Sequence, residues 1–299
     1  MIHSIAISAA LTFSASRALL FLAKRVGWVD EPSAEDSERK LQAAPVPVVG
    51  GAAILVGLMA LEVGGLDSLR PVLPVGHELD GSRIWLALVA AFLLGLVDDL
   101  MRGGLAPGVK VAGQVGVGLV VAHSVFALEP IATLACVLVV PLALNVWNTF
   151  DNADGAATGV GALALFSVGS PAAGPVLGFL GCNLRPRGSA AAYLGDSGSH
   201  LLGCLVLLHP GAWPLMLLPA LDLFRVSCLR ISEGRAPWRG DRLHLAHRMQ
   251  RRGLGPVRVA ASLYLVAALP LLWPGWPGLF LGLFGFLFSV WASRPCSKS

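Results

Sequence analysis

The sequence predicts an all-α fold, a polytopic transmembrane bundle of about ten or eleven helices. Hydrophobic residues make up 55% of the chain and charged residues only 13%, about half the charged share of an average soluble domain. The apolar residues form long continuous stretches, whereas a lipid-facing β-barrel alternates apolar and polar positions. These two observations exclude a soluble domain, a disordered chain and a coiled coil. They favour helices, which satisfy their own backbone hydrogen bonds in lipid.

Eleven apolar stretches approach the length of about 20 residues that a helix needs to cross a bilayer. They are 4–24, 48–66, 83–97, 109–128, 130–149, 155–170, 171–184, 197–209, 211–230, 255–273 and 275–292. The sixth, seventh and eighth are short or poorly separated, so a count of ten is the alternative. The first contains Arg17 and lacks a basic start, so we interpret it as a span and not as a secretory signal. We interpret residues 1–299 as one integral membrane domain.

The basic residues are distributed unevenly over the segments between these stretches. With eleven spans and the N-terminus outside, the inside segments are 24–47, 98–110, 150–154, 183–196, 230–258 and the C-terminal tail, and they contain 18 of the 22 Lys and Arg residues. Lys and Arg favour the cytoplasmic side, so this asymmetry predicts which face is cytoplasmic. It also explains the net charge of +4 without a nucleic-acid partner, for which the sequence has no motif.

Five aspartates fall at span ends on that same predicted face. Asp98 and Asp99 follow the third stretch, Asp151 and Asp154 follow the fifth, and Asp196 precedes the eighth. A single acid at a boundary is ordinarily solvated by water and headgroups, but five like charges from three spans repel unless a cation gathers them. Mg²⁺, or Mn²⁺, suits this place because it takes oxygen ligands together with substrate phosphates. Asp151 and Asp154 share a helix face if the helix continues through them.

Groups that attract phosphate are expected on the same face. Lys110 begins the fourth stretch, and the segment Gly195–Ser199 puts backbone amides at the start of a helix, which suits a phosphate. Arg39 and Lys40 add a basic pair before the second stretch. Taken alone, that pair is best interpreted as a topology anchor.

The largest inside loop, 231–254, contains two histidines among arginines. His244 and His247 are three residues apart, and Arg242 and Arg248 lie nearby, a combination that suits a phosphate or diphosphate. A positive-inside loop with incidental histidines is the alternative. A zinc pair is disfavoured, because no third His or Cys stands nearby.

Five motifs in order along residues 26–250 together resemble one family, the polyprenyl-phosphate N-acetylhexosamine-1-phosphate transferases (glycosyltransferase family 4). They are Val29-Asp-Glu-Pro32 with Arg39-Lys40 and Pro45-x-Pro47-x-x-Gly50-Gly51; Gly95-Leu-Val-Asp98-Asp99 with Lys110 and Gln114; Asn145-x-x-Asn148-x-x-Asp151-x-x-Asp154-Gly155; Asn183-x-x-Pro186 with Gly195-Asp196-x-Gly198-Ser199; and Pro219-x-x-Asp222 with Asp241-x-x-His244-x-x-His247.

The resemblance implies an activity. A member of this family transfers a sugar-1-phosphate from a UDP-sugar to a polyprenyl phosphate and releases UMP, as the first membrane step of cell-envelope polysaccharide synthesis. The active site would face the cytoplasm from the inner (plasma) membrane, and family members are often homodimers. The loop Asp-Arg-x-His-Leu-x-His is more similar to the GlcNAc-1-phosphate transferases than to the phospho-MurNAc-pentapeptide transferase, which stays an alternative.

The resemblance also implies roles for individual residues. The expected catalytic residues are Asp98, Asp99, Asp151 and Asp154, and the expected Mg²⁺ ligands are Asp196 and Asp151. The expected substrate-binding residues are Lys110, Asn148, Asn183, His244, His247, Arg39 and Lys40.

Three positions depart from the family pattern. Gln42 stands where a His is usual, Asn152 replaces a common Gly of a left-handed turn, and Ala246 replaces a His. Asn is the next-best residue for such a turn, but Gln42 and Ala246 make a non-catalytic relative that binds lipid phosphate or nucleotide-sugar one alternative. A transporter is another, but it predicts acids near the bilayer middle.

Overall fold

The structure, a computed structural model, describes residues 2–30, 45–64, 81–101, 103–186, 189–238 and 240–294. Its helices are α1 (Ile2–Val26), α2 (Gly50–Val63), α3 (Gly81–Leu100), α4 (Pro107–Phe126), α5 (Pro130–Phe150), α6 (Ala156–Ser167), α7 (Ala173–Asn183), α8 (Gly195–Leu207), the 3₁₀ helix η1 (Pro210–Met216), α9 (Leu217–Ser232), α10 (Leu245–Arg251), α11 (Pro256–Ala268), the 3₁₀ helix η2 (Leu269–Leu272) and α12 (Trp276–Ala292). Two short antiparallel strands, β1 (Val29–Asp30) and β2 (Val46–Pro47), pair with each other.

This architecture confirms the all-α prediction. Each of the eleven predicted spans coincides with one of these helices, or with a 3₁₀ helix joined to one. Four described helical segments are long and apolar enough to cross a membrane: Ile2–Val26, Pro107–Phe126, Pro130–Phe150 and Pro210–Ser232. The short helix α10 and the strand pair were not predicted. Both are too short for the periodicity of apolar residues to reveal them.

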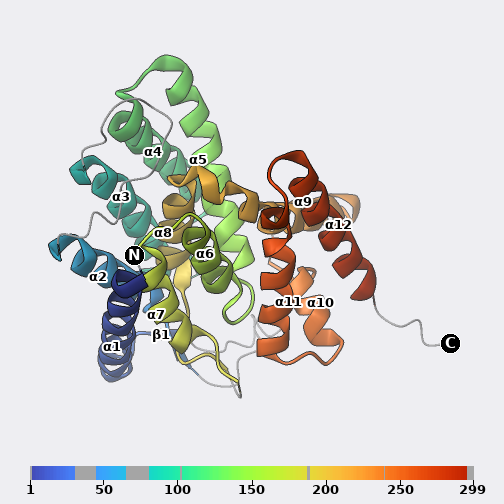
Figure 1. The fold of residues 1–299 in the computed structure, drawn as a ribbon, viewed down its shortest axis with the longest axis horizontal. Coiled ribbons are helices and arrows are strands. Elements are labelled where there is room, and N and C mark those ends of the chain that lie inside the picture. Colours follow the sequence, from blue (N-terminus) through green and yellow to red (C-terminus); the bar gives the residue numbers. More distant parts are fainter. Residues whose placement is uncertain are drawn as a thin grey trace.

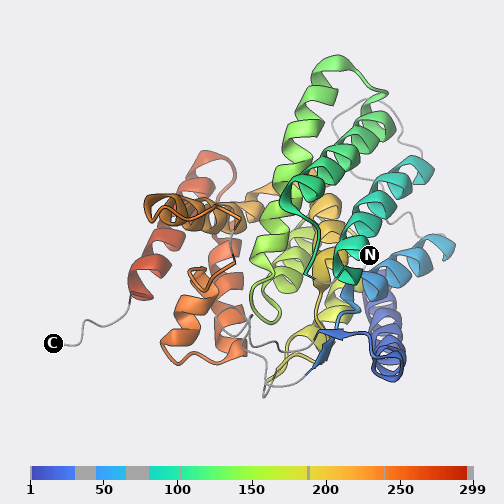
Figure 2. The ribbon, with the colours of Figure 1, turned by 180° about the vertical axis from the view of Figure 1, so that it is seen from behind.

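Two groups of helices stand side by side (Figure 1). Helices α1 to α8 form the larger group, and α9 to α12 form the smaller one, with α5 packing against both α8 and α9. The view from behind shows the same division (Figure 2). In both views the α5–α6 turn, strand β1, helix α10 and the C-terminal end of α12 lie toward the same end of the molecule.

Helix α8 lies at the centre of the larger group. It packs against α2, α3, α5 and α6, and every residue from Ser197 to Val206 is buried. Because these residues are buried, protein encloses the helix on all sides. Its thirteen residues reach only about 20 Å along the helix axis, less than the hydrocarbon thickness of a bilayer. The N-terminus of α8 brings Asp196 to one end of the bundle.

A close approach of two backbones positions the ends of α3 and α8. A Cβ atom on Gly95 would overlap backbone atoms of Asp196 and Ser197. Only glycine permits this distance between the helices. Asp98 and Asp99 follow within one turn of Gly95, so the contact sets both carboxylates beside the start of α8.

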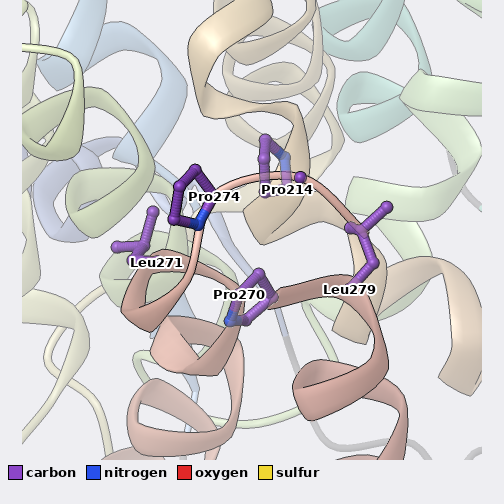
Figure 3. A pocket seen from close by; sticks show the side chains of 6 residues that line it. Pro214, Pro270, Leu271, Pro274 and Leu279 are labelled. Atoms are coloured by element: carbon purple, nitrogen blue, oxygen red, sulfur yellow. The ribbon is translucent and has the colours of Figure 1, made fainter. Parts of the chain in front are cut away.

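An apolar pocket of about 350 Å³ lies among η1, η2 and the start of α12. Pro214, Pro270 and Pro274 line it together with Leu271 and Leu279, and no charged side chain does (Figure 3). The acids singled out in the sequence are not there. Asp98 and Asp196 lie instead where α3, α4, α5 and α8 meet.

Candidate active site

An ion-paired triad joins three helices. The Lys110 ammonium near the start of α4 donates to Asp98 Oδ2 at the end of α3, at 2.9 Å, and to Asp196 Oδ2 at the start of α8. The backbone N–H of Leu105 donates to the second oxygen of Asp98 at 2.5 Å. One ammonium thus neutralises one of two carboxylates and leaves the triad with a formal charge of −1.

Asn148 on α5 adds a fourth helix to this triad. Its Nδ2 donates to Asp196 Oδ1 at 2.6 Å and to Ser199 Oγ at 3.1 Å. Its Oδ1 accepts from Lys110 Nζ at 3.5 Å. Both oxygens of Asp196 therefore have partners, and the carboxylate is fixed in orientation although its side chain is 25% exposed.

Asp99 caps helix α8. Its two carboxylate oxygens accept from the backbone N–H groups of Asp196 and Ser197, at 2.8 and 2.9 Å. A carboxylate at a helix N-terminus satisfies amides that have no partner within the helix and complements the helix dipole. The expectation that these amides would bind a phosphate is therefore wrong for these two, because Asp99 occupies them.

Asp151 and Asp154 lie in the turn that follows α5. The helix ends at Phe150 and Asp151 is its C-cap, so the condition for a shared helix face is not met. The left-handed residue of this turn is Gly155, at φ +73°. Asn152 does not adopt that conformation; its side chain instead donates to the carbonyl of Thr149 at 2.7 Å.

The charge of Asp151 is uncompensated within the described part of the chain. No donor of those residues bonds its carboxylate, whereas Asp154 accepts from the backbone N–H of Ala190 at 2.9 Å. Burial and the negative charges of Asp196, Asp154 and Asp99 raise the pKa of the Asp151 carboxyl well above its usual value. Burial also raises the pKa of Asp154. The charge of Asp196 thus acts on Asp98, Asp99 and Asp151, so acids from all three predicted loops lie near one another.

A second polar layer lies one turn deeper in the bundle. Gln114, Asn145 and His200 stand one turn from Lys110, Asn148 and Asp196 on the same three helices. Asn145 Nδ2 donates to Gln114 Oε1 at 2.7 Å, and Gln114 Nε2 lies 3.3 Å from His200 Nε2. This second layer supports the layer of Lys110, Asn148 and Asp196 from the interior of the bundle. The sequence offered a signal for it, because each member follows or precedes an expected site residue by three or four positions.

Asn183 holds two loops together. Its Oδ1 accepts from the backbone N–H of Gly155 at 3.1 Å and from Thr158 Oγ1 at 2.7 Å, and its Nδ2 donates to the carbonyl of Ala192 at 3.0 Å. The side chain is buried, and these partners occupy its amide. The described contacts give Asn183 a supporting position, and its contact with substrate stays a prediction.

The loop that contains His244 and His247, here called the histidine loop, is hydrogen-bonded to α9. Buried Asp222 accepts from His244 Nδ1 at 2.9 Å, from the backbone N–H of Leu245 at 3.2 Å and from Arg225 Nη2 at 2.7 Å. Arg225 Nη2 also donates to the carbonyl of Leu243 at 2.7 Å. Sequence reasoning named Asp222 only as part of a motif. Its role as the anchor of His244 appears only in three dimensions.

A salt bridge further along α9 also holds this loop. Arg230 donates to both carboxylate oxygens of Asp241, at 2.9 and 3.2 Å. Burial opposes ionisation of Asp241, but the hydrogen bond from Arg230 prevails and lowers the pKa of this carboxyl. His247 Nδ1 lies 2.9 Å from Gln250 Oε1, and burial lowers the pKa of its imidazole. Among the described residues, neither His244 nor His247 makes a hydrogen bond or ion pair with the five aspartates.

The expected substrate residues Arg39 and Lys40, and the variant position Gln42, lie outside the described residues. Ala246 is described and buried in α10.

The acidic residues fit a magnesium ion that is completed by substrate oxygens. Within the described ranges, no three His, Cys, Asp or Glu side chains form a ready cage for a metal. Mg²⁺ is usually held by one or two carboxylates together with phosphates and water, so such a cage is not required. Asp151, whose carboxylate has no donor in the described part of the chain, and Asp196 would supply that number of ligands.

The comparisons with known proteins give a consistent result. No family model matches the chain. A decaprenyl-phosphate N-acetylglucosaminephosphotransferase of Mycobacterium tuberculosis is 28% identical over 324 residues, which cover 86% of this chain and 78% of that protein. An undecaprenyl-phosphate alpha-N-acetylglucosaminyl 1-phosphate transferase of Escherichia coli is 22% identical over 293 residues, covering 83% and 76%. Over most of its length the chain is thus similar to N-acetylglucosamine-phosphate transferases that act on polyprenyl phosphates.

A further relative is a putative glycosyltransferase of Streptomyces coelicolor, 31% identical over 239 residues, which cover 70% of this chain and 56% of that protein. These relatives confirm the resemblance that the five motifs carried, and together with the apolar helices they support a multi-pass membrane transferase. It is the carboxylate–lysine site at the ends of α3, α4, α5 and α8 that combines most of those motifs.

Proposed function

We propose that the protein transfers N-acetylglucosamine-1-phosphate from UDP-N-acetylglucosamine to a polyprenyl phosphate. A phosphate oxygen of the lipid attacks the β-phosphorus of the UDP-sugar, the bond from that phosphorus to the oxygen bridging it to UMP breaks, and UMP leaves. The polyprenyl-diphospho-sugar stays in the membrane. The names of the relatives support the sugar and the lipid class, since they describe N-acetylglucosamine-phosphate transfer to decaprenyl and undecaprenyl phosphate.

The observation that carries this proposal is the joining of Asp98, Lys110, Asn148 and Asp196 from four helices at one end of the bundle. Phosphoryl transfer depends mainly on positioning and on electrostatic stabilisation of phosphate charge. The cluster offers an ammonium donor, an amide donor and carboxylates with fixed orientations. A transporter would place such acids near the middle of the bilayer, whereas these lie at helix ends.

The residues divide into three proposed roles. Lys110 and Asn148 bind phosphate oxygens as charge develops on them. Asp98 orients the lipid phosphate and accepts its proton, next to the Lys110 ammonium that stabilises the carboxylate. Asp154 and Asn183 hold the turn and the loop that border the nucleotide.

Asp151 and Asp196 are proposed to hold Mg²⁺, which would supply positive charge to the diphosphate and to the departing UMP. The carboxylate of Asp151 has no protein donor in the described chain and lies among other acids. A divalent cation is the counter-ion that such an arrangement calls for.

The histidine loop is proposed to contact the donor. His244 is held through Nδ1, so Nε2 is the ring nitrogen directed to other partners. We place the site on the cytoplasmic face of the inner membrane, because Lys and Arg gather in the segments on that side. A homodimer is also proposed, on family resemblance alone.

The test is release of UMP by the purified protein. The full chain is incubated with polyprenyl phosphate, MgCl₂ and each of a panel of UDP-sugars, and UMP is quantified. The proposal predicts UMP only when lipid phosphate is present, with UDP-N-acetylglucosamine as the best donor. A transporter or a binding-only relative would release none, and preference for UDP-MurNAc-pentapeptide would favour the alternative substrate.

A further inference from the structure

The last fifth of the chain carries positive charge without a balancing acid. After Asp241 the sequence contains no Asp or Glu, and its Lys and Arg residues there are Arg242, Arg248, Arg251, Arg252, Arg258, Arg294 and Lys298. Five of them lie in α10 or directly after it, at the start of α11, or just beyond the end of α12: Arg248, Arg251, Arg252, Arg258 and Arg294. We call these five residues the arginine surface.

Hydrogen bonds hold part of this surface against the end of α12. Arg248 Nη2 donates to the carbonyl of Val290 at 2.9 Å, and Arg252 Nη2 donates to the carbonyl of Arg294. Carbonyls in the last turn of a helix lack partners and form the negative end of its dipole. This structural role accounts for one donor of each of two guanidinium groups, and it leaves the net charge of the surface unchanged.

No carboxylate in the described part of the chain lies within ion-pair distance of the arginine surface. Arg251, Arg252, Arg258 and Arg294 are exposed. Burial and the charges of neighbouring arginines lower the pKa of Arg248. Like charges gathered in this way repel one another, so the surface favours an anionic partner.

The adjoining face of α12 indicates where that partner is located. Phe284, Phe288 and Trp291 are exposed along it, and the rings of Phe288 and Trp291 are 5.8 Å apart. Trp276 is exposed at the other end of the helix. Exposed tryptophans at both ends of a span lie at the headgroup level of a bilayer. Trp291 precedes Arg294 by three residues, so the arginine surface begins where the lipid-facing surface ends.

We propose that the arginine surface binds the phosphate groups of anionic phospholipids, in the leaflet at the end of the molecule toward which the α5–α6 turn lies (Figures 1 and 2). A phospholipid phosphate is anchored at the depth that Trp291 marks, and exposed guanidinium groups can reach it from the side. Arginine binds phosphate through paired N–H donors. No described hydrogen bond or ion pair links the surface to the five aspartates.

The test measures lipid preference by native mass spectrometry. The full-length protein is released from mixed micelles that contain equal amounts of phosphatidylglycerol and phosphatidylcholine, and the bound lipids are counted. A basic residue near an anionic surface contributes about 1 kcal/mol, or roughly a fivefold change in affinity. The double variant Arg252→Gln/Arg258→Gln should therefore lower the preference for phosphatidylglycerol by an order of magnitude.

The matched control is Lys24→Gln/Arg25→Gln, which removes two exposed charges at the end of α1. The sequence that follows those residues contains Asp30, Glu31, Glu35 and Asp36, so this control should change the preference by less than about twofold. The single variant Arg258→Gln, whose guanidinium has no described hydrogen bond, gives the same test without risk to the α10–α12 contact. Equal losses in both double variants, an unchanged preference, or displacement of phosphatidylglycerol by millimolar inorganic phosphate would overturn the proposal.

Discussion

Asp99 and Asp196 are 97 positions apart, yet the carboxylate of Asp99 caps the N-terminus of the helix that carries Asp196. Asp99 Oδ1 accepts from the backbone N–H of Asp196 at 2.8 Å, and Oδ2 accepts from Ser197 at 2.9 Å. The end of α3 therefore fixes the position at which Asp196 meets Lys110 and Asn148. This relationship gives Asp99 a positioning role, distinct from that of Asp98 beside it.

Two variants of Asp99 should show how much its carboxylate stabilises the protein as the cap of α8. Asp99→Ala leaves two helix-start amides unpaired and should lower the free energy of unfolding by about 1–2 kcal/mol. Asp99→Asn retains one acceptor oxygen and should lose less. Thermal unfolding in detergent measures both, and UMP release should fall in the same order because Asp196 shifts. Equal unfolding temperatures for the wild type and both variants would contradict the capping role.

The ionised carboxylate of Asp151 should lower the free energy of unfolding at neutral pH, although the proposed reaction requires it. Its pKa in the folded protein is raised above the value of about 4 expected in the unfolded chain. The folded state therefore binds the proton more tightly, and stability falls as the pH rises from that value through the raised pKa. Asp151→Asn should unfold at a higher temperature than the wild type near pH 7, and this difference should shrink toward pH 4. A lower unfolding temperature for the variant near pH 7 would contradict this reading.

The same variant tests the proposed metal ligands. Millimolar MgCl₂ stabilises a protein whose folded state binds the ion, by mass action. The rise in unfolding temperature should be large for the wild type, small for Asp151→Asn, and reversed by EDTA. Equal rises in the two proteins would place the ion elsewhere. Glu129→Gln, at the other end of α5, is a suitable control because it lies far along the helix from the site.

The contact between Asp222 and His244 predicts coupled effects on donor binding. Asp222→Asn and His244→Ala should each raise KM for the UDP-sugar more than they lower kcat. If Asp222 acts through His244, the double variant should resemble His244→Ala alone, with a coupling energy of about 0.5–3 kcal/mol. Steady-state kinetics of the four proteins measure it.

A matched cycle controls for a general loss of structure. Asp154 has no described contact with His244, so Asp154→Asn and His244→Ala should combine additively in free energy. Full additivity in the Asp222 cycle as well would show that Asp222 acts on stability and not through the imidazole.

The sequence was sufficient for the helices and for the gathering of the aspartates. Both follow from long-range features that survive without coordinates, namely the lengths of apolar stretches and the side on which Lys and Arg fall. The pairings were not predictable. That Lys110 bridges Asp98 and Asp196, and that Asp99 occupies the start of α8, both depend on the close backbone approach of α3 and α8 at Gly95.

Local backbone conformation was the other feature that could not be predicted from the sequence. The sequence left open whether α5 continues through Asp154; the helix ends at Phe150, with Asp151 as its C-cap, and the left-handed Gly155 is the N-cap of α6. The role of Asp222 as an anchor could not be read from spacing, since 22 residues separate it from His244.

The most direct test of the central claim, that phosphoryl transfer takes place at the Asp98–Lys110–Asp196 triad, is UMP release by Asp196→Asn. The variant keeps the shape of the side chain and the bond from Asn148 but removes the charge that pairs with Lys110. With unchanged yield and unfolding temperature, the account predicts a fall in kcat of about 100-fold or more, while Glu129→Gln stays at the wild-type rate. A kcat within about threefold of the wild type, at equal folding, would contradict the claim.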